Sequence, residues 1–155
     1  MLEFALLTVP LLFIIISVFG MCLGMWQYHT LVEAVNYTAR KASVHGAGCA
    51  GHTCATTVAS TAQALAASAL GISSSQLNVT LGSSASTVTC NPISSCYLNS
   101  NPWPSLAGNA ALTTQVSIVA TYQFTSAISM WVPGQGALNF SSVTLGAKAL
   151  APMIY

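Results

Sequence analysis

The sequence predicts an α+β protein in which a long N-terminal helix leads into a head with a short second helix and an antiparallel sheet of about four strands. The first 26 residues carry one charge, and a helical spacing of apolar residues continues to about residue 45. Beyond residue 71, apolar and polar residues alternate, which is typical of strands. We therefore expect an N-terminal helix at 1–45 and a globular head at 46–155.

The chain carries too few charges for an ordinary soluble surface. Hydrophobic residues make up 54% of it and charged residues 3%, whereas about 25% of a typical soluble domain is charged. The charged residues are Glu3, Glu33, Arg40, Lys41 and Lys148. A surface of this kind associates readily, so we expect other copies of the chain, or sugar, to cover most of it. Only Arg40 and Lys41 are adjacent, and this excludes nucleic acid as a partner, because phosphate binding needs clustered bases.

The first stretch is long and apolar enough to cross a membrane. No residue from Phe4 to Trp26 is charged, and a helix of this length spans a hydrocarbon layer of about 30 Å. It lacks the basic start of a secretory signal peptide and exceeds the usual apolar core of about 7–15 residues. A plain membrane anchor is the alternative to a helix that also packs against other helices. The residues expected in such helix-core packing are Phe4, Pro10, Phe13, Phe19, Gly20 and Gly24.

The first helix should continue well beyond a membrane. Trp26 and Tyr28 mark the expected membrane interface, where aromatic rings prefer to lie. The apolar positions that follow recur at helical spacing: Leu31, Val32, Val35, Ala39 and Ala42. A helix that ends near residue 45 is about 65 Å long, twice the length that a membrane requires.

A second, shorter helix is expected at 54–70, after a glycine-rich loop at 46–53. Gly71 stands where a helix commonly ends. The apolar stripe of this helix consists of Val58, Ala62, Leu65 and Leu70.

The strands follow this helix. A hairpin is expected from 77–81 and 87–89, and the clearest strand is at 115–124. The last strand is expected at 141–150. The intervening segments, 90–114 and 125–140, are expected to be loops because prolines, glycines and small polar residues gather there.

The cysteines indicate an oxidising compartment. Cys22 lies in the apolar stretch and is expected to be a small packing residue. The other four fall into two close pairs in polar sequence, which suits disulfides. Short loops close most easily and favour Cys49–Cys54 and Cys90–Cys96, although crossed pairings remain open.

No metal, cofactor or catalytic site is expected. His45, Cys49, His52 and Cys54 are all zinc-binding residue types, but their spacing matches no common structural zinc motif. The chain has no aspartate, and Glu33 is the sole acid beyond the apolar stretch. Catalytic triads, paired carboxylates and carboxylate-bound metals therefore lack their acidic members, which argues against an enzyme.

Three N-x-S/T triplets begin at Asn36, Asn78 and Asn139. Such triplets are N-glycosylation acceptors in secreted proteins, but chance also produces them in a chain this rich in Ser and Thr. The sequence leaves both readings open.

Both ends of the chain resemble a known family. LEFALLTVPLLFIII is followed by an amphipathic continuation that ends in Ala39–Ala42. VSIVATYQF, an apolar loop with Pro133 and Gly134, and SSVTLGAKA close the chain. These segments resemble the TadE-like proteins of tight-adherence systems, which belong to the type IV pilin superfamily. The middle, roughly 46–114, carries no such resemblance.

The resemblance implies a type IV-like assembly route. A prepilin peptidase would cut a leader, and the pilus assembly machinery would stack the subunits by their N-terminal helices. Family members usually place a glutamate near the cleaved end, a couple of residues further along than Glu3. A carboxylate buried among apolar helices needs a charge partner, and an N-terminal amine is the nearest candidate. We therefore expect Glu3 of one subunit to neutralise the amine of Met1 of its neighbour and so to set the axial register.

The functional prediction is a structural pilin, a homopolymer that builds an extracellular filament for surface attachment. Before assembly the helix would anchor each subunit in the cytoplasmic membrane with its head outside. Trp103 and Met130-Trp131-Val132 are candidates for subunit contacts or adhesion. The alternatives are a minor pilin or pseudopilin that primes or caps a filament, and a monomeric anchored binding domain outside the cell.

Overall fold

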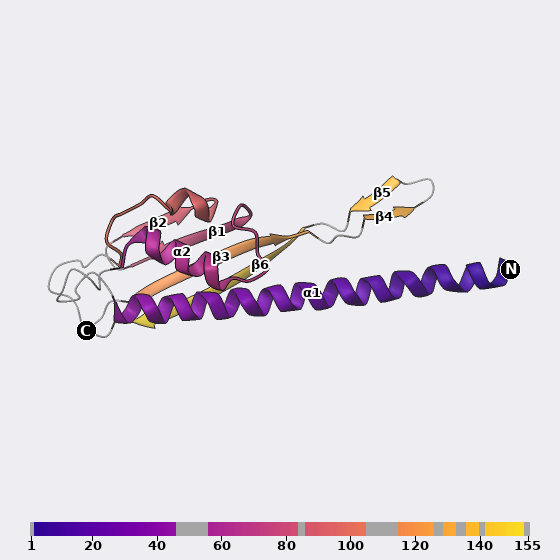
Figure 1. The fold of residues 1–155 in the computed structure, drawn as a ribbon, viewed down its shortest axis with the longest axis horizontal. Coiled ribbons are helices and arrows are strands. Elements are labelled where there is room, and N and C mark those ends of the chain that lie inside the picture. The colour runs from indigo at the N-terminus through magenta and orange to yellow at the C-terminus, as the bar shows by residue number, and fades with distance from the viewer. Residues whose placement is uncertain are drawn as a thin grey trace.

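The computed structural model describes residues 2–45, 56–83, 86–104, 115–125, 129–132, 136–139 and 142–153; for 2–6, 129–132 and 136–139 it describes the backbone alone. In this part of the chain one long helix runs the length of the molecule, and the head lies along its C-terminal half (Figure 1). The head combines a short helix with a four-stranded antiparallel sheet, so the predicted α+β class is confirmed.

Helix α1 spans Leu2–Val44 and ends one residue before the predicted boundary. Its 43 residues correspond to a rod of about 65 Å. The helix continues through Pro10, which lacks the N–H for one backbone hydrogen bond. In its C-terminal half the two buried hydroxyls donate to main-chain carbonyls of the helix itself, Thr38 to Ala34 and Ser43 to Arg40, both at 2.8 Å, so these polar groups are satisfied.

Helix α2 spans Val58–Ser68 and is shorter than predicted. Its first turn is fixed by a capping box, in which the hydroxyl of Thr57 accepts from the N–H of Ser60 at 3.1 Å and the hydroxyl of Ser60 accepts from the N–H of Thr57 at 2.9 Å. The predicted apolar stripe is buried except for Leu70, whose side chain is 65% exposed. That assignment was wrong because the helix ends at Ser68 and Leu70 falls in the turn that follows.

The sheet has the strand order β2-β1-β3-β6, and every neighbouring pair is antiparallel. Strand β1 spans Leu77–Gly82, β2 spans Thr87–Cys90, β3 spans Gln115–Phe124 and β6 spans Val143–Pro152. The hairpin and the clearest strand are as predicted, and β6 lies two residues later than predicted. The two central strands are β1 and β3, so the hairpin and the two long strands form one continuous sheet.

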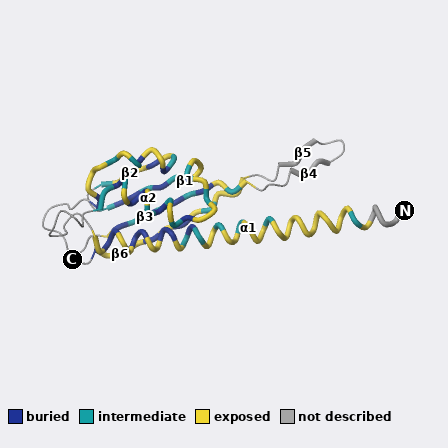
Figure 2. The backbone as a smooth tube through the Cα atoms, viewed as in Figure 1, coloured by how far each residue is buried: buried dark blue, intermediate teal, exposed yellow. Residues whose placement is uncertain are grey.

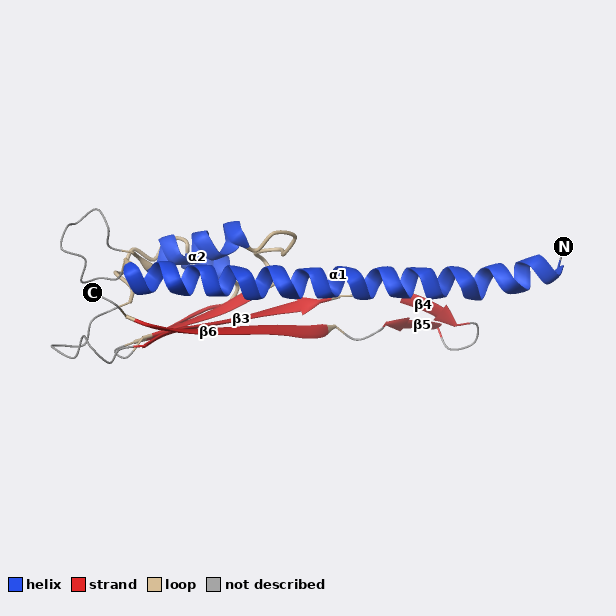
Figure 3. Ribbon diagram, turned by 90° about the horizontal axis from the view of Figure 1, so that it is seen from below, coloured by secondary structure: helices blue, strands red, loops and turns tan. Residues whose placement is uncertain are grey.

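The segment 125–140 is not the simple loop that was expected. It contains strand β4, Ser129–Val132, and strand β5, Gly136–Asn139, which pair antiparallel in a second, two-stranded sheet. The sequence is consistent with this pairing, because two short apolar runs flank Pro133-Gly134, a sequence typical of turns. This small sheet extends beyond the head in the direction of the N-terminus of α1 (Figures 1 and 3).

The predicted loop 90–114 also contains ordered structure. A short 3₁₀ helix, η1, spans Ile93–Cys96, and a disulfide joins Cys96 to Cys90 at the end of β2. This is the pairing that short loops favour. The other expected pair, Cys49–Cys54, lies outside the described residues.

The core lies between the two helices and one face of the sheet. Figure 3 shows α1 and α2 on the same side of the sheet, whose other face no helix covers in the described part of the chain. The buried side chains of the inner face alternate along each strand, as the strand pattern predicts. They are Leu77, Val79 and Leu81 on β1, Val116, Ile118, Ala120 and Tyr122 on β3, and Ala147, Ala149 and Ala151 on β6.

Candidate functional site: the bare half of the long helix

The N-terminal half of α1 is mostly uncovered by the head (Figure 2). We call its residues 7–25 the bare half of α1. Leu7 is 73% exposed, Phe19 67% and Met21 71%, although all three are strongly apolar. The same holds around the helix, so no single face is reserved for the head. The other large apolar side chains exposed along this half are Val9, Leu11, Leu12, Phe13, Ile14, Ile15, Ile16, Val18, Leu23 and Met25.

The helix is long and apolar enough to cross a membrane, and it is the one such helix among the residues that the structure describes. None of its most apolar window is buried within the head. The core helix of a soluble domain would be covered by its own chain. An exposed apolar surface of this extent marks a contact with lipid or with protein.

The residues predicted for helix-core packing are placed differently along this half. Pro10, Phe13 and Phe19 are exposed, and Gly20 is half-buried. Gly24 instead faces its own head, because a Cβ atom built there would lie 3.5 Å from the ring of Phe124.

The register residues lie at the edge of what the structure describes. Met1 and the side chains of Glu3 and Phe4 are outside the described part of the chain. The pairing of Glu3 with the amine of Met1 therefore stays a prediction.

The bare half of α1 begins where the turn after α2 rests on the helix. The side-chain amide of Gln27 donates to the carbonyl of Gly71 at 3.1 Å. The hydroxyl of Thr30 donates to the carbonyl of Gln27 at 2.9 Å and lies 3.4 Å from the carbonyl of Leu70. Gly71 has a φ of +77°, and a Cβ atom there would lie 2.5 Å from the ring of Trp26. We call Trp26, Gln27, Thr30, Leu70 and Gly71 the collar.

Replacing Gly71 by alanine should lower the free energy of unfolding by about 2 kcal/mol, since a left-handed backbone costs an L-residue about 1–2 kcal/mol and the Trp26 ring must also move. The matched control is Gly146→Ala on β6, where a Cβ atom would meet nothing within 4 Å. Chemical unfolding of the full chain in detergent micelles measures both variants. Equal stability of the two variants would show that Gly71 does not hold the collar.

The collar is the part of the site that sequence reasoning missed. Trp26 was placed at a membrane interface and Gly71 at a helix end, and nothing in the sequence indicates that two residues 45 positions apart are in contact. A glycine after a helix signals a positive φ, which is correct here, but the ring that packs on it comes from the tertiary fold.

The remaining predicted site residues are scattered. Asn36 is exposed on α1, Asn78 is half-buried on β1, and Asn139 lies in β5, whose side chains are not described. Within the described residues no three metal-binding side chains come together. Cys49, His52 and Cys54, the other members of the zinc-type set, lie outside those residues.

One comparison with known proteins finds a match. A family model described as TadE-like protein matches residues 1–40. No curated protein and no solved structure matches the chain. The match covers the bare half of α1, the collar residues on α1 and most of the helix that packs on the sheet. The resemblance predicted from the sequence is confirmed for the N-terminal end, where residues 1–40 are similar to the TadE-like family, and for the closing strands it stays a prediction.

Proposed function

We propose that the chain is a pilin, a structural subunit that waits in the cytoplasmic membrane and then polymerises through α1 into an extracellular filament. The observation that carries the proposal is the continuity of α1. One helix of 43 residues is bare in its first half and part of the core in its second half. A helix built in this way carries its head rigidly, and so its packing with other helices sets the position of the head.

The bare half needs a new cover once it leaves lipid. In water its apolar side chains would cost about 25 cal/mol for each Å² left exposed. Helices of other copies, which are equally bare, can cover it. When identical subunits meet through two different surfaces, the contacts do not close, and the result is an open helical filament.

The head is suited to the outside of such a filament. It carries a disulfide between Cys90 and Cys96, which persists in an oxidising compartment. Its surface has few charges, and contact with neighbouring heads would cover part of it. Prepilin peptidase and the assembly machinery are the partners that this role requires, and surface attachment is the activity proposed for the filament.

Shearing the cells that produce this chain and imaging the released material by electron microscopy tests the proposal. A 16 kDa band should dominate the sheared fraction and coincide with filaments. A trace amount beside another major subunit would instead identify a minor pilin, and a purely membrane-bound chain would contradict polymerisation.

A matched pair of variants sharpens this test. Gly20→Leu keeps α1 apolar and therefore anchored, but it removes a small residue that permits close helix approach, so sheared filament should fall at least about tenfold. Val18→Leu, at a position 55% exposed, introduces the same side chain without removing a glycine and should leave the yield unchanged.

A further inference from the structure

Three of the five charged residues of this chain lie close together on α1. They are Glu33, Arg40 and Lys41, and all three are exposed. In the described part of the chain neither Glu33 nor Arg40 has an ion-pair partner. With charge so scarce elsewhere, this concentration on one helix needs a reason.

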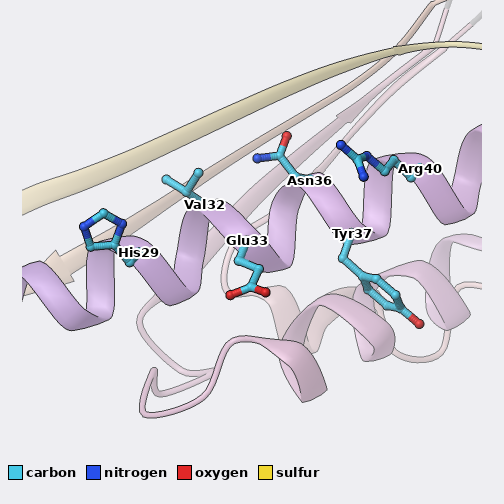
Figure 4. Close-up of a pocket in the computed structure, with 6 residues that line it drawn as sticks. All are labelled: His29, Val32, Glu33, Asn36, Tyr37 and Arg40. Carbon is cyan, nitrogen blue, oxygen red and sulfur yellow. The ribbon is translucent and has the colours of Figure 1, made fainter.

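The acid and the base start from nearly the same face of α1, because seven residues are close to two full turns, but their side chains lean to opposite flanks of its exposed strip (Figure 4). Glu33 borders the hollow between α1 and α2, together with Tyr37 of α1, Ser68 at the end of α2 and Leu70 in the turn that follows. Arg40 leans the other way, toward the side of β6, whereas Glu33 and Tyr37 point toward α2 (Figure 4). The strip between the two flanks is an open hollow in the surface, lined by His29, Val32, Glu33, Asn36, Tyr37 and Arg40.

Glu33 and Arg40 cannot neutralise each other within one helix. They are seven residues apart, which is two turns, or about 10.5 Å along the axis. A second, parallel helix displaced by the same two turns would bring its Glu33 level with Arg40 of the first. The two flanks would then meet as different surfaces of identical subunits, which is the arrangement of an open filament.

We propose that Glu33 of one copy pairs with Arg40 of the next copy and so sets an axial stagger of about two helical turns. The inference rests on the proposed function, because it requires helices that pack side by side. A second copy is the occupant that the structure favours, since the strip continues directly from the bare half of α1, which the same neighbours would cover. The strip is also complementary in charge to itself.

The pair would act on register more than on overall cohesion. Apolar contacts along α1 are tolerant of sliding, because many staggers bury similar surface. Charges between packed helices are less tolerant, since a wrong stagger leaves them unpaired and partly desolvated. Opposite charges in an interface therefore fix which alignment is used, and like charges placed together cost several kcal/mol.

Charge reversal tests the pairing. Glu33→Arg and Arg40→Glu should each lower the yield of sheared filament at least about tenfold, because each brings like charges together between copies. The double variant E33R/R40E should restore the yield to within about threefold of wild type, since the pair is re-formed with its signs exchanged. Lys148→Glu is the matched control, because it changes the net charge as Arg40→Glu does, at an exposed position on β6.

The outcomes separate this inference from the proposed function. Normal filaments from either single variant, or a double variant no better than the singles, would overturn the pairing. A wild-type chain that forms no filament would overturn the pilin proposal itself. Chemical unfolding in detergent micelles should be unchanged in all four variants, because none of these side chains is in the core. An axial rise measured by electron microscopy that is incompatible with a two-turn stagger would also contradict the inference.

Discussion

Replacing Trp103 by alanine is expected to lower the free energy of unfolding by about 3–5 kcal/mol, the cost of removing a large aromatic side chain from a packed core. Trp103 is 1% exposed and is the largest fully buried side chain among the described residues. Chemical unfolding of the full chain in detergent micelles measures the change. The transition is followed by far-ultraviolet circular dichroism of the backbone, so the readout does not depend on tryptophan fluorescence. Leu98→Ala is the control, because Leu98 is 93% exposed and its loss should cost less than about 0.5 kcal/mol.

The segment that carries Trp103 is held to the start of α2 by main-chain hydrogen bonds. The N–H of Val58 donates to the carbonyl of Asn101 at 3.0 Å, and the N–H of Ala59 donates to the carbonyl of Asn99 at 2.9 Å. The first N–H groups of a helix have no partner within it, so these carbonyls satisfy them. Alanine at position 103 would weaken this junction as well as the core. A Trp103→Ala variant as stable as Leu98→Ala would show that the ring contributes no core packing.

The burial of Trp103 corrects the expectation that it forms a subunit contact or an adhesive surface. A loop with prolines is normally a surface segment, and an aromatic residue in it suggests a binding role. Here the disulfide Cys90–Cys96 and the bonds to α2 fold the segment back onto the head. The bonds to α2 join residues that are 40 or more positions apart, and such contacts are not visible in a local sequence pattern.

Periodicity alone predicted the elements with strong repeats. The apolar run and the amphipathic continuation gave α1 to within one residue, and the alternation at 115–124 gave β3 with both its ends. Burial follows the same periods, since Leu31, Val35 and Ala39 face the sheet while Asn36 does not. These predictions are accurate because each depends on residues that are close together in the chain.

The packing of those elements against one another could not be predicted from the sequence. No pattern indicated that α1 packs against β3 and β6, or that the turn after α2 rests on Trp26. The candidate site was predicted as an apolar stretch with one acid at its tip. The collar and the opposite directions of the Glu33 and Arg40 side chains appear only when the head is folded against the helix.

Val35→Asp should unfold the head or cost about 4 kcal/mol or more, because it places an unpaired carboxylate in the core. Val35 is 1% exposed on the face of α1 that packs against the sheet. The variant decides whether the second half of α1 is part of the head or a detachable extension of the anchor. Hydrogen exchange at the backbone amides of β3 and β6, the strands in contact with α1, measures the loss of protection.

Asn36→Asp is the matched control for this substitution. It introduces the same carboxylate one residue later on the same helix, at an exposed position, and should change stability by less than about 0.5 kcal/mol. Protection of β3 and β6 that survives Val35→Asp would mean that the head folds without α1. In that case the orientation of α1 could not set the position of the head. The continuity of α1 would then no longer support the pilin proposal. Loss of protection in Val35→Asp alone would make helix and head one cooperative unit, as a subunit that transmits helix packing to its outer surface requires.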